Sequence, residues 1–153
     1  MSPAEARAAL VVGECRRDWE VLKTHLNRAH AADPSGGDAA AALVALSLDH
    51  AYQAFEATMV RLERAVGLPE RTGHTALLAD AAIAIPGLRP PVFPPEVRGD
   101  WDALLRFRHF LRHAYVVDLD PTKLALNRDR LDQAVAATEA WLAAVLAGLA
   151  HEE

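Results

Sequence analysis

Between residues 98 and 113 the sequence gathers side chains that suit phosphate and proton chemistry. Arginine offers a planar fork of N–H donors for phosphate oxygens, and histidine changes its charge near neutral pH. Only two carboxylates, Asp100 and Asp102, stand among the basic groups. The pattern indicates a site for a phosphodiester. Its basic residues are Arg98, Arg106, Arg108, His109, Arg112 and His113.

This run is predicted to form one helix, from about Asp100 to Val117. At about 100° per residue, apolar side chains fill one arc and polar ones the other. A solvated helix face usually mixes Glu and Lys, whereas residues 104–117 contain neither an acid nor a lysine. The polar arc therefore favours a functional surface, and an ordinary exposed face is the alternative. The predicted core arc is Ala103, Phe107, Phe110, Leu111, Ala114 and Val117, and the polar arc is Arg108, His109, Arg112, His113 and Tyr115.

Arg108 and His113 are five residues apart, which would turn them roughly 140° from each other on a helix. Two side chains so placed do not easily converge on one phosphate. A two-fold axis beside the helix would bring Arg108 of one chain towards His113 of the other. The spacing therefore predicts a homodimer with a shared site. His109 and His113 have metal-ligand spacing, but no Asp, Glu or Cys lies one turn away, so we expect no metal.

The longer string from Arg108 to Tyr115 fits the pattern R-x4-H-x-Y. It resembles the signature of HEPN ribonucleases, and specifically of HepT-like toxins. The resemblance covers nearly the whole chain, because upstream residues and a proline-rich loop also match that family in order and spacing. The upstream residues are Tyr52, Glu56, Gly73, His74, Leu77 and Leu78.

The resemblance implies a metal-independent, cofactor-free endoribonuclease toxin of a type VII (HEPN/MNT) toxin–antitoxin system. It implies a homodimer with Arg108 and His113 as the catalytic pair. Its partner would be an MntA-like nucleotidyltransferase antitoxin, which silences the toxin by transferring AMP to Tyr115. RNA carries its own nucleophile, the 2′-hydroxyl, so His113 would move the protons and Arg108 would stabilise the developing charge. Supporting or RNA-binding roles are expected for His109, Arg112 and His74.

Two other functions stay open. By the same resemblance, one is a non-catalytic HEPN adaptor that presents a substrate to a nucleotidyltransferase. The other is a purely structural dimerising bundle. An adaptor has no need of both Arg108 and His113, so the motif favours the enzyme.

Glu56 lies one turn from Tyr52, where the two could form a buried polar contact, and it is a candidate for orienting Arg108.

The elements that must position these residues are predicted to be helices. Residues 2–5 have the form of a capping box, and an apolar stripe with a period of about 3.5 residues follows to residue 29. Asp38 is expected to cap a second helix that stops at Gly67. A shorter helix fits His74 to Ile85. Asp120 and Pro121 are expected to start the last helix, which ends near residue 150.

Residues 86–95 contain five prolines, which excludes a helix or a central strand. We expect an ordered loop, held on the bundle by Val92 and Phe93. The whole pattern predicts an all-α, up-and-down bundle of four or five helices, HEPN-like and homodimeric, with residues 1–153 as one domain.

Composition limits the class of protein further. The chain has 153 residues, one cysteine and a net charge of −5. A single thiol excludes an internal disulfide and a cysteine-based zinc site. The net charge argues against bulk electrostatic binding to nucleic acid, although a local basic patch remains. No uninterrupted apolar run reaches the ~20 residues of a membrane span, so we expect a cytoplasmic protein without a membrane partner.

Overall fold

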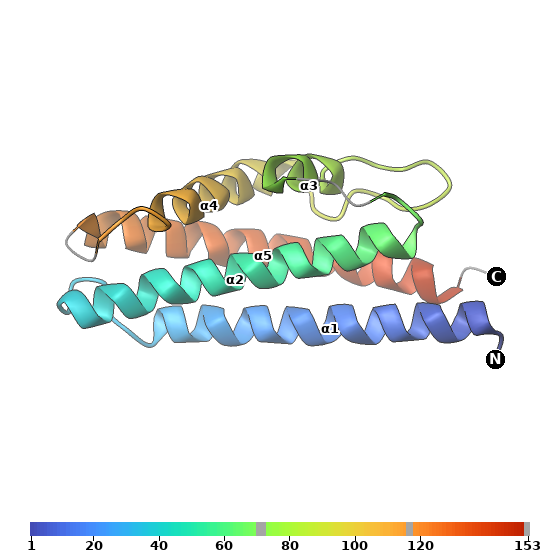
Figure 1. Ribbon diagram of the computed structural model, residues 1–153, viewed down its shortest axis with the longest axis horizontal. Helices are drawn as coiled ribbons and strands as arrows, with labels where there is room; N and C mark the ends of the chain where they lie inside the picture. Colours follow the sequence, from blue (N-terminus) through green and yellow to red (C-terminus); the bar gives the residue numbers. More distant parts are fainter. Residues whose placement is uncertain (70–72, 116–117, 152–153) are drawn as a thin grey trace.

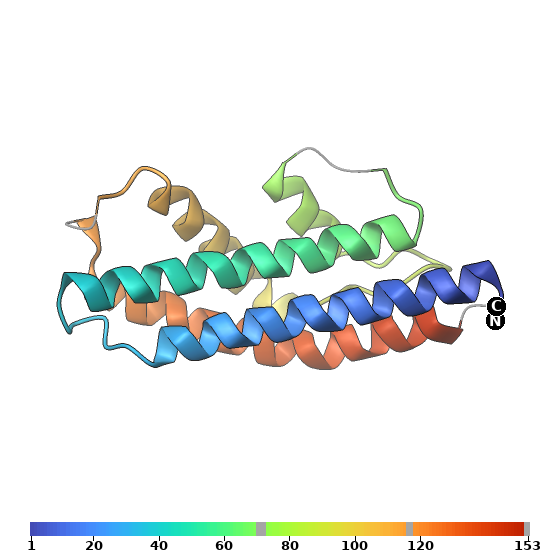
Figure 2. The same ribbon diagram turned by 60° about the horizontal axis from the view of Figure 1, so that its bottom comes forward.

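The computed structural model describes residues 1–69, 73–115 and 118–151, and shows a chain running up and down along one long axis (Figure 1). Three long helices, α1, α2 and α5, lie side by side in both views, and the shorter α3 and α4 pack against α2 and α5 (Figure 1 and Figure 2). The described residues form no β-strand, which confirms the all-α bundle. The elements are α1 (Pro3–His30), α2 (Asp38–Ala65), α3 (His74–Ala81), the 3-10 helix η1 (Pro95–Val97), α4 (Arg98–Leu111) and α5 (Pro121–His151).

Helix ends follow local signals in the sequence, with one correction. The capping box at Ser2 is present, since its hydroxyl accepts from Glu5 N–H while the Glu5 carboxylate accepts from Ser2 N–H. The α2 helix ends in a left-handed Gly67 with φ +77°, as expected. Asp38, however, does not cap α2. It is the first helical residue, and the cap position belongs to Gly37 at φ +106°, without a side-chain hydrogen bond.

The centre of the core is an aromatic cluster that joins α2, α4 and the proline-rich loop. Trp101 stacks on Phe55 with centroids 3.8 Å apart, and its indole N–H donates to the Thr138 hydroxyl of α5 at 3.1 Å. Val92 and Phe93 are each 1% exposed, which confirms that they hold the loop on the bundle. The buried Arg89 braces the same loop by donating to backbone carbonyls of residues 80, 83 and 90.

The α3 helix is shorter than predicted, because it ends at Ala81 rather than at Ile85. From residue 82 the chain turns into the loop, where Ile85 forms an isolated antiparallel bridge with Arg89. The carbonyl of Ala81 accepts from Val92 N–H at 2.9 Å. The end of α3 is therefore set by the returning loop, and no helix-breaking residue near Ala81 predicts it.

Two predictions about α4 were wrong. The helix ends at Leu111, residues 112–115 follow as turn and irregular chain, and the predicted end, Val117, lies outside the described residues. Its buried face is also rotated from the predicted arc. Ala103 is buried, and Phe107 and Leu111 pack against the core as predicted, but Phe110 is 47% exposed, and the side chains of Trp101, Leu104 and Leu105 are buried as well. At about 100° per residue, these three buried residues lie on the same side of the helix as Arg108. Arg108 therefore points towards the bundle.

The last helix, α5, buries one apolar face along its length, with Leu124, Leu131, Val135, Leu142 and Leu146 inward as predicted. By length and composition alone it could also cross a membrane, since its mean hydropathy is 1.4 over an 18-residue stretch. In the bundle it contacts α1, α2 and α4. A core helix of a helical bundle has the same character.

Candidate active site

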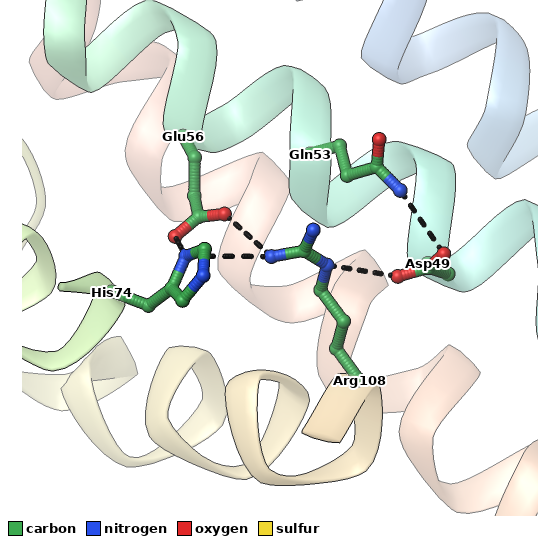
Figure 3. A network of polar contacts seen from close by, with 5 residues as sticks. All are labelled: Asp49, Gln53, Glu56, His74 and Arg108. Carbon is green, nitrogen blue, oxygen red and sulfur yellow. Dashed lines mark hydrogen bonds and ion pairs between the residues drawn. The ribbon is translucent and has the colours of Figure 1, made fainter. Parts of the chain in front are cut away.

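Arg108 lies between α2 and α3, held by two carboxylates of α2 (Figure 3). Its Nε donates to Asp49 Oδ1 at 3.0 Å and its Nη1 to Glu56 Oε1 at 2.8 Å. The other oxygen of Glu56 lies 2.5 Å from His74 Nδ1, and Gln53 donates to the second oxygen of Asp49. We call Asp49, Glu56, His74 and Arg108 the clamp.

The clamp is largely shielded from solvent but not closed. The side chains of Arg108 and Glu56 are 13% and 12% exposed, and that of Asp49 is 23% exposed. Two carboxylates face one guanidinium, and the imidazole of His74 lies beside Glu56 and Arg108. The Nη2 group of Arg108 donates to none of the residues drawn in Figure 3. The arginine is fixed in direction and keeps one group for a further acceptor.

Each member of the clamp is placed by helical spacing. Asp49, Tyr52 and Glu56 follow at steps of three and four, and therefore share one side of α2. His74 is the first residue of α3, directly after Gly73, whose φ of +118° favours glycine. The clamp thus depends on the packing of α3 and α4 against the middle of α2.

Tyr52 does not make the polar contact with Glu56 that the sequence suggested. Its ring is 1% exposed and packs edge-on against Trp101. Its hydroxyl has no hydrogen-bond partner among the described residues. Burial, with the nearby Glu56 carboxylate as a smaller cause, raises the pKa of the Tyr52 hydroxyl. Tyr52 is therefore a protonated core residue.

The other candidate residues surround the C-terminal end of α4. His109 is exposed on the helix, and Arg112 and His113 are exposed in the turn after Leu111. Because His113 lies beyond the helix, the predicted 140° relation to Arg108 does not apply. Within the described chain no hydrogen bond joins Arg108 to His113. A single chain does not bring the two together. Of the predicted residues, His74 and Glu56 lie against Arg108, and Glu56 contacts it as the sequence suggested.

Tyr115 is 78% exposed and lies outside α4. The prediction that it shares a helical face with Arg108 was therefore wrong. The Asp118 carboxylate accepts from Tyr115 N–H at 2.9 Å. Tyr115, Leu46 and Asp49 line one shallow depression of about 200 Å³. The tyrosine therefore lies next to the outer edge of the clamp through this shared depression, and not through a helical face.

Asp49 is the site residue that sequence reasoning missed. The signal was its spacing of seven from Glu56, which puts both carboxylates on the side of α2 that carries the buried Tyr52. Carboxylates beside a buried stripe need a cation. Among the described residues, no three His, Cys, Asp or Glu side chains are grouped so as to hold a metal ion.

Comparison with known proteins gave one match. A family model described as "HepT-like protein" matches residues 43–149, which is more than two thirds of the chain. The matched segment includes the whole clamp and the string from Arg108 to Tyr115, and leaves α1 outside. No curated protein and no solved structure matches the chain.

Proposed function

Because this chain belongs to the HepT-like family, we propose that it is a metal-independent endoribonuclease, the toxin of a type VII (HEPN/MNT) toxin–antitoxin system. The observation that carries the proposal is the clamp: Arg108 is fixed by Asp49 and Glu56 at the start of the R-x4-H-x-Y string. A guanidinium held in advance needs little reorganisation when charge develops on a phosphate.

The proposed chemistry uses the 2′-hydroxyl of RNA as the nucleophile. His113 accepts its proton as the oxygen attacks phosphorus. The resulting imidazolium then donates that proton to the 5′-oxygen as the P–O5′ bond breaks, which gives a 2′,3′-cyclic phosphate and a 5′-hydroxyl. A positioned histidine contributes typically ~10²–10⁴-fold to such a step. Arg108 would hold the non-bridging oxygens through its remaining N–H donors. DNA lacks the 2′-hydroxyl and would not be cut.

A homodimer is part of the proposal, because one chain does not bring His113 to Arg108. Exposed apolar side chains lie close to the clamp: Leu46 is 52% and Tyr115 78% exposed, and both line the depression that includes Asp49. Burying such side chains favours association. A two-fold axis here would bring His113 of one subunit towards Arg108 of the other. Arg112 and His109, both exposed, are proposed to contact flanking phosphates.

Control by a nucleotidyltransferase partner of the MntA type is proposed for Tyr115. Its hydroxyl is carried on a side chain that is 78% exposed, which suits attack on a bound nucleoside triphosphate. The AMP group would add volume and negative charge beside Asp49, where the phosphate of the substrate must approach. The proposal includes a cytoplasmic location, where RNA and this partner meet, and no membrane partner.

The clamp also supplies the observation that favours a second function. Two carboxylates offset the charge of Arg108, as they would in a purely structural ion pair. In that case the chain is a non-catalytic adaptor of a nucleotidyltransferase.

An RNA cleavage assay in EDTA separates the two functions. The proposed enzyme cuts RNA to 2′,3′-cyclic phosphate ends. The cleavage rate of the His113→Ala variant should be lower by about 100-fold or more, as expected when a proton-transfer group is removed. His30→Ala is the matched control, because His30 pairs with Asp132 away from α4. Intact RNA with dimeric wild-type protein, or equal cutting by His113→Ala, would overturn the proposed ribonuclease activity.

The proposed modification is tested separately. The intact mass of the protein after co-expression with a nucleotidyltransferase should show an AMP adduct that Tyr115→Phe abolishes.

A further inference from the structure

A second pocket lies on the other side of α4 from the clamp, between α4 and the first turns of α5. Its volume is about 360 Å³, at the small end of the range for ligand sites. The lining residues are Ala103, Arg106, Phe107, Phe110, Asp118, Leu119, Asp120, Lys123, Leu124, Asn127 and Arg130. We call it the α4–α5 pocket.

Helical spacing builds both walls of this pocket. On α4, Arg106 and Phe110 are four apart and share a face, with the buried Ala103 and the half-buried Phe107 beside them. On α5, Lys123, Asn127 and Arg130 follow at steps of four and three. The two helices therefore face each other with a cationic row and an aromatic pair.

The cations of the pocket are uncommitted. Among the described residues, Arg106, Lys123 and Arg130 form no ion pair, and the guanidinium of Arg130 is held by Asn127 Oδ1 at 3.2 Å. Asn127 is itself only 6% exposed. Three unpaired cations around a small pocket attract an anion.

The two carboxylates of the pocket are partly engaged. Asp118 accepts from Tyr115 N–H and Asp120 from Thr122 N–H, each at 2.9 Å. They leave a net charge of about one positive unit, counted from three cations and two carboxylates. That balance suits one phosphate group better than a triphosphate.

The aromatic pair adds a preference for a planar ring. The ring centroids of Phe107 and Phe110 are 6.3 Å apart. The side chain of Phe110 is 47% exposed at the border of a pocket that three cations line. Proteins that bind single-stranded nucleic acid combine such features, a cationic groove for the backbone and aromatic rings for the bases.

We propose that the α4–α5 pocket binds one nucleotide, with the base on Phe110 and Phe107 and the phosphate on Arg106, Lys123 and Arg130. The source is either a free nucleoside monophosphate or a nucleotide of an RNA strand that continues past His113 at the end of α4. The second source rests on the proposed function; the binding itself does not.

The test is titration of the full-length His113→Ala protein with AMP, UMP and inorganic phosphate, followed by amide NMR shifts and calorimetry. Nucleotides are expected to shift amides of the pocket and to bind more tightly than phosphate. Phe110→Leu should weaken AMP roughly tenfold or more and leave phosphate binding unchanged, whereas Phe110→Tyr should retain AMP. Lys123→Gln should weaken both ligands, and Arg17→Gln, an exposed arginine of α1, should weaken neither.

Several results would overturn the proposal: no nucleotide binding, shifts confined to other parts of the chain, or unchanged AMP affinity in Phe110→Leu. Sedimentation of Phe110→Leu gives one more such result. Loss of the dimer in that variant would mean that a second copy of the chain covers the pocket. A tetraribonucleotide that competes with AMP identifies an RNA strand as the source, and AMP binding without competition identifies a free nucleotide. If nucleotides bind but RNA is never cut, only the ribonuclease fails; if RNA is cut but nucleotides do not bind, only the pocket fails.

Discussion

Replacing Arg108 by methionine removes the cation from between two partly buried carboxylates while keeping most of the side-chain volume. Asp49 and Glu56, 23% and 12% exposed, would then repel each other with only His74 nearby. Breaking a fully buried ion pair costs ~3–5 kcal/mol, and the residual exposure of this one reduces the expected cost to about 2–3 kcal/mol. For a chain of this length that lowers Tm by roughly 4–12 °C.

Urea and thermal unfolding measure this cost directly. Arg106→Met is the matched control, because Arg106 lies exposed on the same helix without an ion pair to a described residue, and its variant should stay within about 0.5 kcal/mol of wild type. Adding Asp49→Asn and Glu56→Gln to Arg108→Met should restore most of the lost stability, since no charge is left to repel.

The same series separates folding from catalysis. If Arg108 acts on the phosphate, the stable triple variant stays inactive against RNA. The reasoning about the clamp is refuted if Arg108→Met unfolds at the urea concentration of wild type, or if neutralising both carboxylates restores nothing. In either case the ion pairs contribute little to the fold.

Three further predictions concern groups away from the clamp. Burial raises the pKa of the Cys15 thiol to about 12, so a thiol reagent at pH 8 should react with it only as fast as the chain opens; rapid labelling of native protein would contradict this. Burial, and then the charges of His50 and Arg28, lowers the pKa of His25. The unfolded state therefore takes up this proton first, and stability should fall as pH drops below about 6.5. In His25→Gln the urea midpoint should depend less on pH; an unchanged pH dependence would argue against it. Thr138→Val leaves the Trp101 N–H without its acceptor and should cost about 1–3 kcal/mol in urea unfolding, whereas the exposed Thr24→Val should cost little.

The sequence was sufficient for the all-α architecture because the local signals agree with one another. The capping box at Ser2, the apolar stripe of α1 and the left-handed Gly67 are all set by neighbours in the chain. Val92 and Phe93 were predictable for a different reason, since large apolar side chains in a proline-rich loop have nowhere else to go.

The site was harder to predict because tertiary contacts override local preference there. Leu111, Arg112 and Ala114 are good helix formers, yet α4 ends at Leu111, and the chain beyond it is held by Asp118. The buried face of α4 is rotated from the predicted arc because Trp101 and Leu105, on the side of Arg108, pack into the core. Only the position of α2 reveals that Arg108 points inward to two carboxylates.

If the chain cuts RNA as proposed, the clamp and the α4–α5 pocket would divide the task of binding the strand between them. Asp49 and Glu56 fix the guanidinium of Arg108 in direction, but they also cancel its attraction for a distant anion. Arg108 can therefore stabilise a phosphate only after the strand has arrived. The attraction must come from cations without carboxylate partners among the described residues, such as Arg106, Lys123 and Arg130. In a chain with a net charge of −5, salt should then weaken RNA binding mainly through the pocket. Lys123→Gln should reduce the salt dependence of RNA binding by His113→Ala protein, and Arg108→Met should leave it nearly unchanged. The opposite result would mean that Arg108 itself attracts the strand.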